Sequence, residues 1–253
     1  MTTYKIKIWL SNELRNHSFN SGYAPDRAAK IGKTYIENAF HNHTDSANVS
    51  ISQTGIPVPY EGCVDYDGTM ICSNWDKYWN TMWDWWKDYS TADCTDLSLA
   101  RDTNLLITNG TACSQGWGQS HWAYACVGRK LLAADPDNYK KFGTDCEDKA
   151  IDAIQEEVAH SLHYNNSKPD KDGDGRESHD YGTVKYNNGD GYITPVGRVG
   201  ADGAYSGAGV DYNNCNEYAD KSDTDWDGDD VADGWAHWYS DCSIDHFTTN
   251  PGP

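Results

Sequence analysis

Alternating hydrophobic and polar positions open the chain and predict its first strand at residues 4–10. Residues 47–56 alternate in the same way and predict a second strand. A short apolar run at residues 105–108 predicts a third. Because side chains alternate across a strand, every second residue of the first strand lies on one face. That face comprises Tyr4, Ile6, Ile8 and Leu10.

Hydrophobic residues at helical spacing predict three helices among these strands. One runs from residue 24 to about residue 40, with Pro25 near its start, where a missing N–H costs no hydrogen bond. A second covers residues 75–89 and carries five tryptophans, most of which we expect in the core. The third covers residues 147–163. Its apolar stripe consists of Ile151, Ile154, Val158 and Leu162.

The order of these elements predicts an α+β fold, with a mixed twisted sheet backed by helices. After Asn165 the chain is rich in Gly, Asp, Asn and Tyr and shows little periodicity, so we expect long loops there. We expect a single domain over residues 1–253. Residues 1–165 form an N-terminal subdomain with the sheet, and residues 166–253 form a loop-rich, disulfide-linked C-terminal subdomain.

The eight cysteines predict disulfides, because their number is even and no Cys-x-x-Cys pair occurs. Disulfides place a protein outside the reducing cytosol, so we expect a secreted, extracellular protein. The N-terminal residues alternate like a strand, and we expect any export signal to have been removed. Short loops favour the pairs Cys63–Cys72, Cys113–Cys126 and Cys215–Cys242.

The charge is strongly acidic, with 39 Asp and Glu against 20 Lys and Arg and a net charge of −19. Such a surface repels phosphate backbones and anionic lipids, so we expect neither a nucleic-acid nor a membrane partner. Of the 39 acidic residues 31 are Asp, an excess that resembles proteins of halophilic microbes. We expect a monomer.

One helix segment carries the candidate chemistry. Glu156 and His160 are four residues apart and therefore neighbours on one helix face, from which both reach a single metal ion. Carboxylate oxygen and imidazole nitrogen both bind Zn²⁺. Glu157 lies between them, where a carboxylate acts as general base. An exposed helix face also carries Glu and His without any function, and this interpretation stays open.

The same segment, Glu156-Glu-Val-Ala-His-Ser-Leu162, resembles the metzincin zinc peptidases, whose pattern is His-Glu-x-x-His-x-x-Gly-x-x-His/Asp. Residues 179–184 and 193–196 resemble the later His of that clan and its turn beneath the metal. The resemblance implies a zincin-like fold in which the helix at 147–163 is the active-site helix. It implies His179 as the third zinc ligand.

The sequence departs from the clan pattern at three positions: Glu156 replaces the first His, His163 the Gly, and Val196 the Met. His163 lies about 10 Å along the helix axis from Glu156, so it does not share a metal with both Glu156 and His160. Together the departures indicate altered metal affinity or lost activity.

Two acidic runs with interspersed glycine predict calcium sites, since alternate Asp residues bring several oxygens around one Ca²⁺. Neither run has Glu at the twelfth position of a standard EF-hand loop, and a solvated acidic loop remains the alternative. The candidate ligands are Asp170, Asp172, Asp174 and Glu177 in the first run, and Asp225, Asp227, Asp229 and Asp233 in the second.

These observations favour a secreted zinc endopeptidase acting on a polypeptide substrate. Zn²⁺ is then held by Glu156, His160 and His179, with Glu157 as general base. The substrate strand is expected along an edge formed by Leu105, Leu106, Ile107 and Thr108. The alternative is a catalytically inactive relative that serves as an extracellular binding or surface protein stabilised by calcium. A carbohydrate-binding platform of exposed aromatic rings is a minor third possibility.

Overall fold

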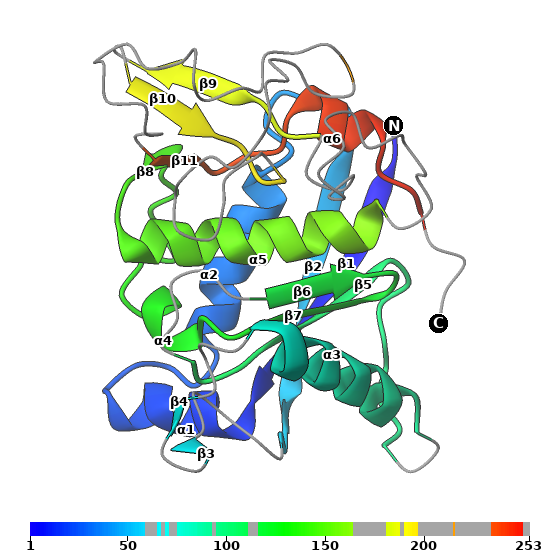
Figure 1. Ribbon diagram of the computed structural model, residues 1–253, viewed down its shortest axis with the longest axis vertical. Helices are drawn as coiled ribbons and strands as arrows, with labels where there is room; N and C mark the ends of the chain where they lie inside the picture. The colour runs from blue at the N-terminus through cyan, green and yellow to red at the C-terminus, as the bar shows by residue number, and fades with distance from the viewer. Residues whose placement is uncertain are drawn as a thin grey trace.

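The computed structural model describes residues 1–58, 65–66, 69–70, 75–92, 95–110, 116–163, 181–187, 190–196, 215 and 234–249. Their centre is a five-stranded sheet (Figure 1). In spatial order its strands are β2 (Ser46–Ile56), β1 (Thr3–Ser11), β5 (Thr103–Ile107), β7 (Trp122–Ala125) and β6 (Gly116–Gln119). The first four are parallel, and β6 pairs antiparallel to β7. Among the described residues, β2 and β6 therefore form the two edges.

Helices cover both faces of this sheet. Helices α2 (Arg27–Asn38) and α5 (Cys146–Leu162) lie on one face. Helix α3 (Trp75–Thr91) lies on the other, against β6 and β7. Two hydrophobic clusters result, the larger between the sheet and α2 and α5, the smaller between the sheet and α3.

The predicted faces of the strand and of the third helix are both confirmed. Tyr4, Ile6, Ile8 and Leu10 are each at most 2% exposed, and they point toward α2 and α5. The apolar stripe of α5 packs against them, and all four of its residues are fully buried: Ile151, Ile154, Val158 and Leu162.

The C-terminal part contains more regular structure than the sequence predicts. A second sheet has the order β8 (Phe142–Gly143), β11 (Gly234–Ala236), β10 (Asp190–Ile193) and β9 (Val184–Asn187). These strands are too short to show a periodic pattern, which is why the region reads as loops. Helix α6 (Asp241–Asp245) follows, and the predicted disulfide Cys215–Cys242 is confirmed. The other two proposed pairs include cysteines outside the described residues.

The remaining elements are short. Helix α1 (Asn12–Asn20) follows β1 directly, with Ser11 capping it through a bond from the N–H of Leu14. Helix α4 (Gly128–Leu131) follows β7. A two-stranded ladder joins β3 (Asp65–Tyr66) and β4 (Thr69–Met70).

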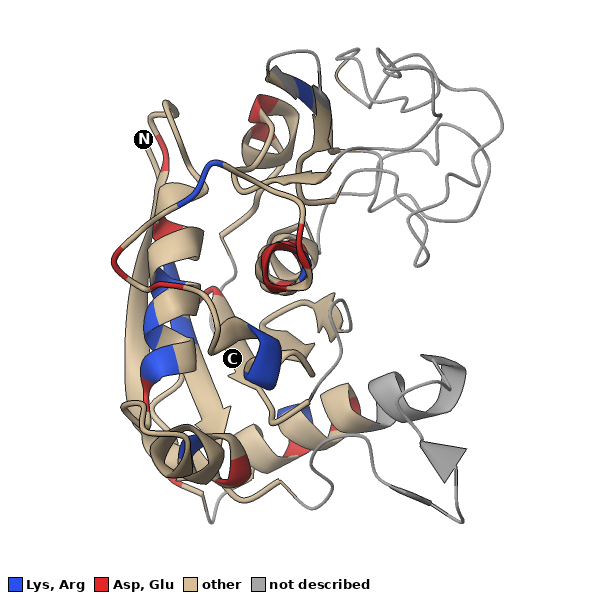
Figure 2. Cartoon of the chain, turned by 90° about the vertical axis from the view of Figure 1, so that its left-hand side faces the viewer, with Lys and Arg blue, Asp and Glu red and all other residues tan. Residues whose placement is uncertain are grey.

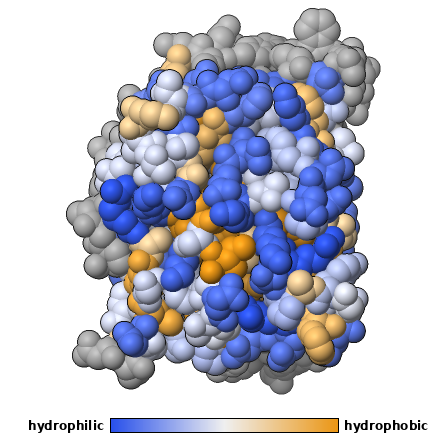
Figure 3. All heavy atoms as spheres, turned by 180° about the vertical axis from the view of Figure 1, so that it is seen from behind, coloured by the Kyte–Doolittle hydropathy of each residue, from blue (hydrophilic) through white to orange (hydrophobic). Residues whose placement is uncertain are grey.

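Within the described part of the chain, no helix has the length and apolar character that a membrane crossing requires. The side of the molecule opposite to the view of Figure 1 is mostly hydrophilic, with apolar residues confined to a small central patch and a few isolated positions (Figure 3).

Candidate metal centre and edge strand

Helix α5 positions the candidate ligands and is well defined at its start. The Asp145 side chain accepts the N–H of Asp148 at 2.9 Å, and the Asp148 carboxylate in turn accepts the N–H of Asp145 at 3.4 Å. This reciprocal capping satisfies N–H groups that have no partner within the helix. The apolar stripe then fixes the rotation of α5, so that its acidic positions turn away from the larger cluster. Figure 2 shows the helix nearly end-on with these positions in red.

Glu156 and His160 meet as the sequence predicts. Glu156 Oε1 lies 3.5 Å from His160 Nε2, and their side chains are 22% and 12% exposed. Two ligands of one tetrahedral zinc ion, each about 2.1 Å from it, are about 3.4 Å apart. The pair therefore has the spacing of two ligands of one metal, and side chains four residues apart on a helix also make such a contact without a metal.

Glu157 occupies a different environment, beneath the edge strand β6. It is 6% exposed, and its Oε2 has no hydrogen-bond partner among the described residues. A Cβ at Gly116 would lie 2.7 Å from Glu157 Oε1, and one at Gly118 would lie 2.0 Å from the Glu157 carbonyl oxygen. Both strand residues that face α5 are thus glycine because the helix fills the space of a side chain.

Burial governs the charge of Glu157. Loss of solvent raises the pKa of its carboxyl well above the ordinary value, and the nearby carboxylates of Glu156 and Asp152 raise it further. The pKa of the Asp152 carboxyl is also raised well above its ordinary value, by burial and by the nearby carboxylate of Glu156. The positive charge of Lys149 acts in the opposite direction. These three carboxyl groups lie within two turns of α5. Asp152 was missed in the sequence, although it precedes Glu156 by one helical turn.

His163 serves the packing of the C-terminal segment. It caps the end of α5, and its Nε2 lies 3.1 Å from the carbonyl oxygen of Ser243. Its ring stacks on Tyr181 at 4.2 Å between centroids. The prediction that His163 does not share a metal with Glu156 and His160 stays a prediction.

Val196, which stands at the Met position of the resemblance, is buried and has a positive φ of 58°. For a β-branched residue this is a strained conformation. It is held by a hydrogen bond from the Gly182 N–H to the Val196 carbonyl at 2.9 Å. Nearby, the Thr183 N–H donates to Thr194 Oγ1 at 2.8 Å. The segments at 181–183 and 193–196 therefore lie together.

Several predicted ligands lie outside the described residues, so their roles stay predictions. They are the third zinc ligand His179 and all eight calcium candidates, Asp170, Asp172, Asp174, Glu177, Asp225, Asp227, Asp229 and Asp233.

The expected substrate edge was misplaced. Strand β5 lies in the middle of the sheet, between β1 and β7, and its backbone is paired on both sides. Leu105, Leu106, Ile107 and Thr108 are fully buried, which explains their apolar run. An added strand has no place there. The edge beside α5 is β6, with the sequence Gly-Trp-Gly-Gln.

Another cluster of metal-binding atoms involves Cys215, Cys242 and His246. Their ligand atoms lie within 4.8 Å of one another, the only such group of three or more in the described ranges. The two sulfurs are joined in a disulfide, which leaves no thiolate to bind a metal. His246 Nδ1 is 2.8 Å from the carbonyl oxygen of Cys242.

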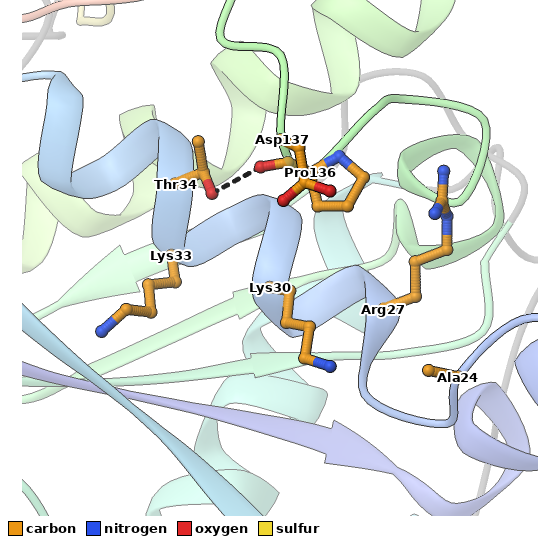
Figure 4. A pocket seen from close by; sticks show the side chains of 7 residues that line it. All are labelled: Ala24, Arg27, Lys30, Lys33, Thr34, Pro136 and Asp137. Carbon is orange, nitrogen blue, oxygen red and sulfur yellow. Dashed lines mark hydrogen bonds between the residues drawn. The ribbon is translucent and has the colours of Figure 1, made fainter.

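A cavity of about 450 Å³ lies between α2 and the turn after α4, away from these groups (Figure 4). The basic side chains that line this cavity already have partners. Lys30 pairs with Asp26 at 3.2 Å, and Lys33 pairs with Glu37 at 3.1 Å. Arg27 donates to the carbonyl oxygens of residues 132 and 134. The basic side chains thus tie α2 to its surroundings. The lining residues are Ala24, Arg27, Lys30, Lys33, Thr34, Pro136 and Asp137.

Helix α5 brings two possible metal donors together, and among the described residues no third donor converges with them. One carboxylate and one imidazole stand at a ligand-ligand spacing, and a buried carboxyl with an unsatisfied oxygen is adjacent. No protein-family model matches the chain, and no curated protein sequence matches it.

Proposed function

We propose that the chain is a secreted, zinc-dependent endopeptidase of the metzincin type. The observation that carries the proposal is the joint placement of three side chains on α5. Glu156 and His160 lie side by side, and Glu157 lies beneath the edge of the sheet. The disulfide Cys215–Cys242 supports an extracellular location.

The residues have distinct roles in this proposal. Glu156, His160 and His179 would hold the ion, which would supply Lewis acidity. Glu157, in its ionised form, would accept the proton of the attacking water and pass it to the leaving amine. Burial of Glu157 keeps bulk water away from this proton transfer.

The substrate is proposed to lie along β6. An extended peptide that pairs with a free strand edge gains backbone hydrogen bonds, and its side chains alternate between the two faces. Glu157 contacts the backbone of β6 from the α5 side. A peptide bound at the next strand position would therefore run past the carboxyl that serves as base. This location replaces the one expected at residues 105–108.

The test is cleavage of an unfolded protein by the zinc-loaded chain. We expect Glu157→Gln to lower kcat by about 10²- to 10⁴-fold while zinc remains bound, because only the proton acceptor is removed. Glu147→Gln is the matched control, since it changes an acidic residue in the first turn of the same helix. Unchanged cleavage by the Glu157 variant would refute its role as base.

The second candidate is the inactive, calcium-stabilised binding or surface protein. It is favoured by the Glu156–His160 contact, in which the two side chains are neighbours on one helix face without any metal. In this case the chain neither retains zinc nor cleaves peptides, and calcium raises its melting temperature through the acidic runs.

A further inference from the structure

The two faces of β6 differ sharply in the side chains that they carry. Gly116 and Gly118 face α5 and pair with Ala125 and Ala123 of the larger cluster. Because side chains alternate along a strand, Trp117 points to the opposite face. Its partner across the ladder is Tyr124, a buried residue of the cluster beneath α3.

Trp117 lies across the ladder from Tyr124, which belongs to an aromatic layer beneath α3. It is 39% exposed, one of few large hydrophobic side chains at the described surface. The layer behind it is anchored: Trp122 Nε1 donates to Ser90 Oγ at 2.8 Å, and Trp83 Nε1 donates to the Trp122 carbonyl at 3.1 Å.

The described residues place no strand on the outer side of β6. A peptide that paired there would put one side chain directly opposite Trp117, at the distance of a cross-strand pair, about 5 Å between Cβ atoms. Its next side chains would point toward α5. There they would meet no β6 side chain, because Gly116 and Gly118 have none, and would approach Glu157.

We propose that Trp117 is the specificity-determining residue of this edge, and that it selects extended polypeptides with an aromatic or β-branched side chain opposite its ring. Such pairs are the favourable partners of an aromatic residue across a ladder. The two peptide residues on either side of this position would lie over the backbone of β6 and over Glu157. They therefore take small side chains. The inference rests on the proposed docking at β6 and adds the class of residue that the edge recognises.

The test uses a background in which binding is separated from cleavage. The full chain with Glu157→Gln is titrated with fluorescently labelled Ser/Thr octapeptides that carry a single Phe at each position in turn. We expect Phe at one register to tighten binding about fivefold over the parent peptide. Trp117→Ala abolishes this gain and Trp117→Phe largely keeps it. Phe19→Ala keeps it fully, since Phe19 is exposed on α1.

The outcomes separate this inference from the proposed function. A Phe gain that survives Trp117→Ala overturns the role of Trp117, and so does the absence of binding by every peptide. If the gain depends on Trp117 but the zinc-loaded wild type cleaves nothing, the edge recognises peptides as inferred and the peptidase proposal fails.

Discussion

At the scale of single residues, the burial of His237 fixes its protonation state. The ring is fully buried, its Nδ1 donates to the Lys140 carbonyl at 3.0 Å, and its Nε2 lies 3.9 Å from Asp148 Oδ1. Tyr35 packs edge-on against it. Burial lowers the pKa of His237 to about 4. The neutral ring therefore links the C-terminal strand β11 to the start of α5 at neutral pH.

This pKa predicts a loss of stability in acid. Above pH 6.5 the ring is neutral in both folded and unfolded chains. As the pH falls from 6.5 to about 4, only the unfolded chain gains the proton, which costs the fold roughly 3 kcal/mol. The facing groups are Asp148, Asp145, Lys140 and Tyr35, and the raised pKa of Asp148 acts in the opposite direction.

The difference between wild type and His237→Asn isolates this contribution, because the Asn amide can still donate to the Lys140 carbonyl. Urea unfolding at several pH values measures it. We expect the difference in unfolding free energy to change between pH 6.5 and 4 and to stay constant above pH 7. A difference that does not vary with pH would show that His237 does not titrate as described.

At the scale of elements, the contact between β6 and α5 depends on Gly118. A Cβ there would lie 2.0 Å from the Glu157 carbonyl oxygen, and backbone cannot rotate away as a side chain can. Gly118→Ala should therefore lower the free energy of unfolding by about 1–3 kcal/mol, as overpacking does. Gln119→Ala, on the exposed side of the same strand, should change it little. Equal effects of the two substitutions in urea unfolding would contradict this packing.

The same elements show what the sequence can and cannot predict. Periodicity identified β1, β2, α2, α3 and α5. It missed β6, because the side facing α5 carries glycines and thus no hydrophobic residue to mark it. It mistook β5 for an edge, because an apolar run indicates burial but not the order of strands in a sheet.

The candidate site was predictable only in part. Helical spacing sufficed to bring Glu156 and His160 together, since both belong to one helix. The placement of Glu157 beneath β6 depends on tertiary packing between segments about forty residues apart, which no local pattern encodes. The positive φ of Val196 likewise follows from its contacts with residues 181–183.

At the scale of the whole molecule, the net charge of −19 opposes compaction. Salt screens this repulsion, because the Debye length falls from about 30 Å at 0.01 M to about 3 Å at 1 M. We expect the melting temperature to rise by several degrees between 0.01 M and 1 M NaCl. Sucrose at equal osmolality controls for non-ionic stabilisation. A melting temperature that falls with added NaCl would show that attractive ion pairs dominate instead.

Zinc binding by α5 can be measured as the zinc content of the purified protein. Mass spectrometry of wild type, His160→Ala and His17→Ala gives the comparison, His17 being a control on α1. The account predicts about one zinc per chain in wild type and in the His17 variant, and almost none in His160→Ala. A wild type without zinc, or one whose zinc survives His160→Ala, would contradict it.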